Sequence, residues 1–185
     1  MIYLINSGHG GAVEINGVKY YLTKGKRSPE VPPGIFEGEF NRDISRRLVY
    51  RINIETDHQA INLTPGPINI PLKSRVKYAN ELMDEVSELV IWLSIHANAS
   101  GKNGWSDASG PRVFCHPGSI EGRSIADKLG WPVKTSRTLY ELRKTKMPSV
   151  LLECGFMTNR SEAEIMASEP GRKKISDDIF LSLFS

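Results

Sequence analysis

Three short apolar runs constrain the fold of this chain more than any other feature, because each is followed at once by polar, chemically versatile side chains. The runs cover residues 1–5, 89–95 and 150–152. The run at 89–95 is apolar at consecutive positions, which is typical of a central strand that helices cover on both faces. We therefore expect all three runs to be strands of one buried sheet.

Amphipathic helical patterns lie between the runs. The first begins at Glu37. The second lies between a strand candidate at 60–63 and the run at 89–95. Their apolar positions are Phe40, Ile44, Leu48 and Ile52, followed by Leu72, Val76, Ala79, Met83 and Val86. Strands that alternate with helices are typical of a parallel sheet. The expected fold class is therefore α/β, with a mostly parallel sheet in a single domain.

Shorter patterns predict the remaining elements. Asn16-Gly17 lies between two short β-type segments and predicts a hairpin at 13–21, inserted after the first strand. A connector rich in Lys, Arg, Ser and Pro follows at 24–33. Further elements are expected as strands at 60–63, 113–115 and 138–142, a glycine-rich loop at 101–111, a helix at 122–129, a short helix with a capping box at 161–164, and a closing helix through Ile175, Ile179 and Leu183.

Composition excludes several classes of function. A chain of 185 residues, 39% of them hydrophobic, can bury a core without disulfides or a structural metal. Its net charge of +3 is scattered, which does not favour nucleic-acid binding. Cys115 and Cys154 have no metal-motif spacing. No apolar run approaches the ~20 residues of a membrane span, and residues 1–5 lack the features of a signal peptide.

Four residues are candidates for a catalytic metal site. His9, His96 and Glu153 each follow or end an apolar run, and Glu37 opens a helix. In an open α/β sheet the ligand site lies beyond the carboxyl ends of the strands, so these residues can converge. Two imidazoles and one carboxylate can hold a zinc ion that activates water, and a second carboxylate can transfer the proton. The alternative is that the histidines only end strands and that Glu153 pairs with a basic side chain.

The sequence around these residues resembles a known family. Five ordered motifs closely resemble those of the zinc-dependent N-acetylmuramoyl-L-alanine amidases of the amidase 3 family. They are Asn6-Ser7-Gly8-His9-Gly10-Gly11, Glu37-Gly38-Glu39-Phe40-Asn41, Leu72-Lys73-Ser74-Arg75 with Ala79-Asn80, Ser94-Ile95-His96-Ala97-Asn98-Ala99, and the stretch from Met147 to Asn159. The resemblance extends through nearly the whole chain, so residues 1–185 are expected to be one zinc amidase catalytic domain.

The resemblance implies a twisted sheet flanked by helices on both faces, and hydrolysis of the amide between N-acetylmuramic acid and L-alanine in peptidoglycan. By position, His9, Glu37 and His96 match the zinc ligands and Glu153 the catalytic acid/base. Glu37 is preferred to Glu39 because the family's ligand stands four residues before an asparagine. The alternatives are a zinc peptidase that cuts the stem peptide and a wall-binding module without turnover.

Two residues depart from the family pattern. Asn6 stands where the family usually has an aspartate, so a carboxylate that could orient an imidazole is replaced by an amide. Cys154 follows the catalytic glutamate where a small or apolar residue is usual, and strand alternation should point it away from Glu153. Among the other candidates, Trp105 either stacks on a sugar or anchors its loop, and Arg75 is expected to be structural.

The expected partner is peptidoglycan, bound by a monomer without nucleic acid or a membrane span. We expect a phage endolysin, made in the host cytoplasm and acting on the wall after release. The alternative is an exported bacterial enzyme whose signal has been removed.

Overall fold

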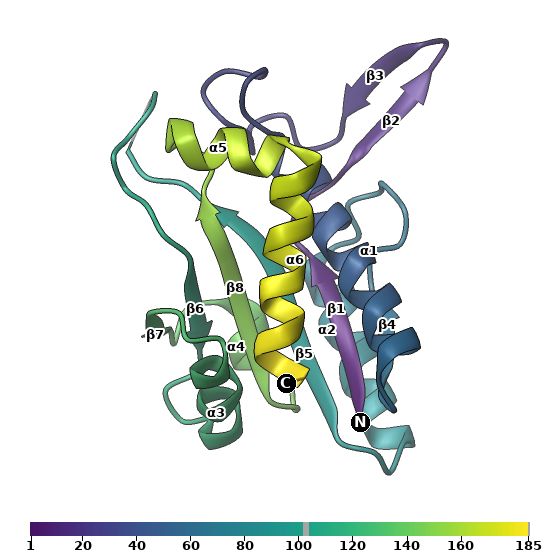
Figure 1. Cartoon of the computed structure of the whole chain (residues 1–185). Coiled ribbons are helices and arrows are strands. Elements are labelled where there is room, and N and C mark those ends of the chain that lie inside the picture. The colour runs from purple at the N-terminus through teal and green to yellow at the C-terminus, as the bar shows by residue number, and fades with distance from the viewer. Residues whose placement is uncertain (102–103, 185) are drawn as a thin grey trace.

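The computed structural model describes residues 1–101 and 104–184. Lys102 and Asn103 belong to the expected glycine-rich loop and lie outside the described residues, as does Ser185. A six-stranded sheet in the order β4-β1-β5-β8-β6-β7 forms the centre of the molecule, and β2 and β3 form a separate hairpin (Figure 1). The strands are β1 Ile2–Ser7, β2 Ala12–Ile15, β3 Val18–Tyr21, β4 Gln59–Asn62, β5 Val90–Asn98, β6 Arg112–Cys115, β7 Val133–Thr135 and β8 Ser149–Phe156.

The sheet is mostly parallel, as the alternation of patterns predicts. β1 pairs in parallel with both β4 and β5, and β5 pairs in parallel with β8. β6 is the exception, because it runs antiparallel to β8 with Arg112 opposite Glu153 and Cys115 opposite Val150. The carboxyl end of β6 therefore lies at the opposite edge of the sheet from the carboxyl ends of β1, β5 and β8.

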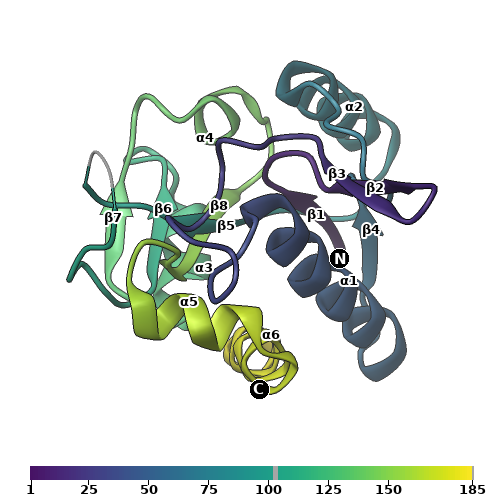
Figure 2. The ribbon, with the colours of Figure 1, turned by 90° about the horizontal axis from the view of Figure 1, so that it is seen from above.

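Helices cover both faces of this sheet (Figure 2). Helices α1, α3, α5 and α6 lie on one face, and α2 and α4 lie on the other. The helices are α1 Glu37–Glu55, α2 Leu72–Glu85, α3 Ile120–Lys128, α4 Tyr140–Lys144, α5 Arg160–Ala167 and α6 Glu169–Phe184. None of the helices in the described part of the chain is long and apolar enough to cross a membrane.

Strand alternation divides the core into two parts. Along β1, Tyr3 and Ile5 pack in the larger cluster beneath α1 and α6, while Ile2 and Leu4 pack in the smaller cluster beneath α2. This is the period-2 pattern of a strand covered on both faces. The predicted apolar stripe of α1 is confirmed, since each of its members is fully buried in the larger cluster; they are Phe40, Ile44, Leu48 and Ile52.

The prediction of a strand at 138–142 is wrong. The Ser136 hydroxyl accepts hydrogen bonds from the backbone N–H groups of Thr138 and Leu139, which turns the chain into the short helix α4. The neighbouring residues Glu141 and Leu142 are both buried, which a helical turn on the sheet allows and a strand with one exposed face does not.

The cap of α5 lies two residues earlier than the predicted capping box. The Asn159 side chain accepts the N–H of Glu162, and α5 begins at Arg160. The Glu162 carboxylate in turn accepts the N–H groups of Phe156 and Gly110, so it ties the glycine-rich loop to the end of β8. The predicted hairpin is confirmed, with its turn at Asn16 and Gly17, both at positive φ.

Candidate metal centre

His9 lies in the loop that follows β1, at the carboxyl edge of the sheet. Its backbone has a φ of 60°, which is uncommon for a residue with a side chain. Just before it, a Cβ on Gly8 would stand 2.2 Å from Cε1 of His96. The His96 ring can therefore pack against the loop only because residue 8 has no side chain.

Glu37 is the first residue of α1, which enters the site from the other side of the loop. Its backbone N–H donates to the carbonyl of Lys26 at 2.9 Å, so the inserted connector positions the start of the helix. A Cβ on Gly38 would stand 1.8 Å from the carbonyl oxygen of Gly10. The helix start can contact the His9 loop this closely only because residue 38 is glycine.

His96 and Glu153 lie side by side on β5 and β8. They are register partners in these parallel strands. The residues on either side of each of them, Ile95 and Ala97, and Leu152 and Cys154, pack in the larger core cluster. By alternation, the side chains of His96 and Glu153 therefore point to the opposite face, where α2 and α4 lie.

The structure brings together His9, Glu37 and His96. One carboxylate oxygen of Glu37 lies 3.2 Å from Nε2 of His9, and the other lies 3.1 Å from Nδ1 of His96. One ligand atom from each residue falls within 4.8 Å of the others, and this is the only such group of metal-type side chains in the described part of the chain. Glu39 is not part of it, because its carboxylate pairs with Lys19 of the hairpin.

The charge balance at Glu37 favours a carboxylate. Burial by itself raises the pKa of Glu37, but the hydrogen bonds to His9 and His96 outweigh burial and hold the pKa below its ordinary value. Burial by itself lowers the pKa of His96, and the hydrogen bond to Glu37 together with nearby carboxylates raises it. The group is therefore arranged around an ionised Glu37 and nitrogen atoms that face it.

Neighbouring groups hold the Glu37 carboxylate in position. Its Oε1 accepts from the backbone N–H of Ala97 at 3.3 Å and from the side-chain amide of Asn41 at 3.4 Å. The same amide of Asn41 donates to the carbonyl of Gly8 at 3.1 Å, so one side chain links the helix to the His9 loop.

Glu153 presents a carboxylate of a different kind. Its Oε2 is buried and has no hydrogen-bond partner among the described residues. Burial raises the pKa of Glu153 to about 7, against a lowering effect of His96. A carboxyl group that titrates near neutral pH suits a general acid/base.

The donor set fits a divalent metal. Two imidazole nitrogens and one carboxylate oxygen are the ligands of many catalytic zinc sites, which keep a further position for water or substrate. The unpartnered Oε2 of Glu153 is the orphaned buried polar atom expected beside such a site. The arrangement can therefore hold a metal next to a proton-transfer group.

The other two histidines of the chain lie outside this group. His116 is at the opposite edge of the sheet, because β6 runs antiparallel to β8, and its Nδ1 accepts the N–H of Gly118. His58 packs against Tyr3 and Phe184. His58 thus packs against aromatic rings of β1 and α6.

Cys154 and Trp105 are placed by packing. The Cys154 thiol is buried in the larger core cluster, and burial raises its pKa, so it points away from Glu153 as alternation predicts. The guanidinium of Arg160 lies 4.8 Å from the centre of a Trp105 ring, which covers one face of the indole and anchors the loop.

The departure at Asn6 has a structural counterpart. The Asn6 amide donates to the Ser94 hydroxyl at 2.7 Å and accepts from the buried Arg75 at 2.6 Å. Asn6 is therefore engaged within the sheet and with α2. Arg75 also donates to the carbonyl of Ser7 at 2.7 Å, which confirms the structural role expected for it.

Sequence reasoning missed Glu141. It lies on α4, is 4% exposed, and places Oε1 4.0 Å from Nε2 of His96. The one sequence signal for Glu141 would be an acidic residue on the buried side of a helical turn. Because residues 138–142 were predicted as a strand, this signal was not recognised.

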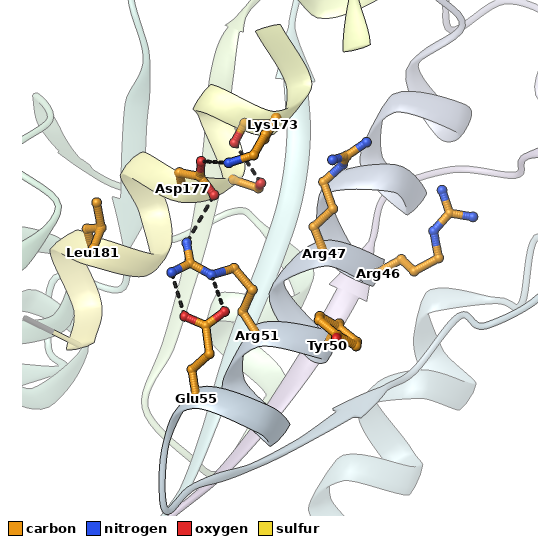
Figure 3. Close-up of a pocket in the computed structure, with 9 residues that line it drawn as sticks. Arg46, Arg47, Tyr50, Arg51, Glu55, Lys173, Asp177 and Leu181 are labelled. Atoms are coloured by element: carbon orange, nitrogen blue, oxygen red, sulfur yellow. Dashed lines mark hydrogen bonds and ion pairs between the residues drawn. The ribbon is translucent and has the colours of Figure 1, made fainter. Parts of the chain in front are cut away.

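A groove with a volume of about 670 Å³ lies elsewhere, between α1 and α6 (Figure 3). Figure 3 shows the Arg51 guanidinium between Glu55 and Asp177, with Lys173 also on Asp177. Its lining includes neither a histidine nor Glu37 or Glu153. The groove therefore lies apart from the candidate metal centre.

The chain is similar in sequence to two proteins of Bacillus subtilis. The chain is 26% identical over 187 residues to the uncharacterized protein YqiI of Bacillus subtilis, covering 95% of this chain and 79% of YqiI. It is 26% identical over 120 residues to a germination-specific N-acetylmuramoyl-L-alanine amidase of the same organism, covering 59% of this chain and 47% of that protein.

Solved structures share the fold. An N-acetylmuramoyl-L-alanine amidase from Clostridium difficile 630 superposes with a TM-score of 0.78 at 23% identity, covering 98% of this chain and 93% of that chain. The family model described as N-acetylmuramoyl-L-alanine amidase matches residues 4–185. The chain therefore belongs to the amidase 3 family of N-acetylmuramoyl-L-alanine amidases.

Proposed function

We propose that residues 1–185 form a zinc-dependent catalytic domain that hydrolyses the amide between N-acetylmuramic acid and L-alanine in peptidoglycan. The observation that carries this proposal is a His–Glu–His group together with Glu153 on β8, the strand next to that of His96, whose Oε2 is buried and has no hydrogen-bond partner among the described residues. Membership of the amidase family supports the choice of bond.

In this proposal His9, Glu37 and His96 hold the metal. Bound zinc polarises a carbonyl oxygen and lowers the pKa of water to about 7. The ionised state of Glu37, set by the two imidazoles, keeps the donor set ready for a cation. Asn41 and the N–H of Ala97 fix the carboxylate, which limits the reorganisation that binding requires.

Glu153 is the proposed acid/base. Its carboxylate takes one proton from the attacking water, and the same proton then passes to the nitrogen of the departing L-alanine. The water oxygen becomes part of the carboxyl group left on the lactyl group of N-acetylmuramic acid, and the second proton of the water leaves this carboxyl group for the released amine or for solvent. A pKa near 7 lets one group accept and then return a proton at neutral pH.

Digestion of purified peptidoglycan tests the reaction. We expect the wild-type protein with zinc to release glycan strands free of peptide, together with peptides that begin at L-alanine, as identified by mass spectrometry. Glu153→Gln should lose activity by roughly 10²–10⁴ while it keeps the fold and the metal. Peptides cut internally would instead favour the stem-peptide peptidase, and no products from several wall types would favour a binding module.

The paired variants Glu37→Gln and Glu39→Gln test the metal site. The two carboxylates are two residues apart on α1, but only Glu37 faces the imidazoles. We expect Glu37→Gln to lose zinc in a chelator competition and Glu39→Gln to retain it. The opposite result would transfer the ligand role to Glu39.

We also propose that the domain acts on the cell wall after release from the cytoplasm in which it is made, as an endolysin does. Expression with and without a membrane-permeabilising protein tests this route. Lysis that depends on permeabilisation supports it, and spontaneous export of active enzyme contradicts it.

A further inference from the structure

A third buried carboxylate, that of Glu141, lies beside the proposed metal ligands. It comes from α4, which packs on β8 and lies on the same face of the sheet as α2. Glu141 is 4% exposed, whereas its helix neighbours Arg143 and Lys144 reach toward solvent. Burying a charged group is costly unless neighbouring groups form hydrogen bonds or ion pairs with it.

A chain of polar contacts leads to Glu141 through the sheet. Arg75 donates to Asn6 at 2.6 Å, and Asn6 donates to the Ser94 hydroxyl at 2.7 Å. The amide nitrogen of Asn6 can only donate, so the Ser94 oxygen accepts there and its single proton is available for Oε1 of Glu141, 3.4 Å away. These contacts hold the carboxylate at the side of His96.

The two ring nitrogens of His96 face different carboxylates. Nδ1 lies 3.1 Å from Glu37, and Nε2 lies 4.0 Å from Glu141. A neutral imidazole that binds a metal through Nδ1 must carry its proton on Nε2. In this site Glu141 is the acidic group that the proton faces.

We propose that Glu141 is a positioning residue for the metal site: its carboxylate accepts the Nε2–H of His96 and so fixes the tautomer whose Nδ1 lone pair points toward Glu37 and the metal. The separation of 4.0 Å is longer than a hydrogen bond. The proposed role therefore requires the Glu141 carboxylate and Nε2 of His96 to come within hydrogen-bond distance when the metal binds through Nδ1. This inference rests on the metal site of the proposed function.

Metal affinity measured without substrate tests the role. Zinc affinity is obtained by competition with a chromophoric chelator for the wild type, Glu141→Gln and Glu141→Leu. Outer carboxylates of this type change metal affinity by about 10–100-fold. We expect Glu141→Leu to fall in this range and Glu141→Gln, whose amide oxygen is a weaker acceptor, to lie between it and the wild type.

Asp43→Asn is the matched control. Asp43 is also a buried carboxylate, 7% exposed and on the ligand-bearing helix α1, but its partners are Arg46 and Arg47. The control loses the same charge without touching a histidine, and its zinc affinity should stay within about twofold of the wild type, below the range for outer carboxylates. The Co²⁺ absorption spectrum should change in the Glu141 variants and not in the control.

The outcomes separate this inference from the proposed function. If the wild type binds zinc and both Glu141 variants match it in affinity and Co²⁺ spectrum, the positioning role is overturned and the proposed function stands. If the wild type binds no zinc, the metal assignment and this inference fail together. Glu141→Gln keeps an acceptor for Ser94, so it remains informative if Glu141→Leu does not fold.

Discussion

The two faces of the sheet differ most toward the carboxyl ends of the strands. On the face beneath α1 and α6, side chains stay apolar to the ends of β5 and β8, as at Ile95 and Cys154. On the face beneath α2 and α4, the same strands change from apolar residues to Ser94, His96 and Glu153. Adjacent residues of one strand therefore serve different purposes: one packs in the core, and the next contributes to the candidate site.

This difference assigns distinct tasks to the two faces. The larger core cluster carries the buried stripe of α1 and the apolar side of α6, so it holds the fold together. The polar end of the other face keeps groups whose burial is costly unless they are paired. Apart from Glu37 at the start of α1, substitutions in the larger core cluster should therefore change stability and spare metal binding, and those on the second face should do more to the site.

Leu48→Ala should give the largest change in stability. Leu48 is fully buried on α1, and removal of its side chain costs roughly 2–5 kcal/mol of unfolding free energy through lost burial and the cavity left behind. Denaturant unfolding measures this change, and chelator competition should show unchanged zinc affinity at a temperature where the variant is folded. A large loss of affinity would break the division between the faces.

Glu153→Gln should stabilise the metal-free protein at high pH. The folded pKa of about 7 lies above the ordinary value of 4.5, so between these values the unfolded chain releases a proton that the folded chain keeps. The wild type therefore loses stability as pH rises through this window, by about 3 kcal/mol in total, and glutamine does not. Unfolding in the presence of chelator at pH 4 and pH 8 checks the difference, which should be small at pH 4.

Asn6→Ala tests the polar contacts within the sheet. The substitution removes partners from Ser94 and from the buried Arg75, and it should cost about 1–3 kcal/mol of unfolding free energy. Asn80→Ala is the control, since Asn80 also makes two hydrogen bonds, here to backbone groups, from a half-buried position on α2. Equal losses in the two variants would show that burial adds nothing at Asn6.

Glu39→Gln should give the smallest effect. Its ion pair with Lys19 joins α1 to the hairpin and is partly exposed, and pairs of this kind contribute about 0–1 kcal/mol. Thermal unfolding at low and high salt checks this, with the difference from the wild type shrinking at high salt. A loss beyond this range would show that the hairpin contributes more to the start of α1 than its contacts suggest.

Much of the fold was predictable because its signals are local. The stripe of α1, the Asn16-Gly17 turn and the doubly covered strand β5 follow from residue spacing alone. The direction of β6 did not, since the residues of a four-residue strand do not indicate whether it runs parallel or antiparallel to its neighbour. Short elements depend on tertiary packing that the sequence does not display.

The candidate site was predictable in part for a related reason. His9, His96 and Glu153 stand at the ends of apolar runs, so the rule for parallel sheets gathers them. Glu141 stands inside a segment with mixed strand and helix character, and its approach to His96 depends on how α4 packs against β8. Because His96 and Glu141 are 45 positions apart in the chain, their spacing does not predict this contact.

The close approach of Gly38 to Gly10 has a consequence for how this chain tolerates change. Any side chain at position 38 would collide with the backbone oxygen of Gly10, and one at Gly8 would collide with the His96 ring. Neither glycine donates an electron pair or a proton. In a saturation library screened for wall lysis, these two positions should nevertheless accept almost no replacement, as strictly as the ligands themselves, because they set the distance between the parts that carry the ligands.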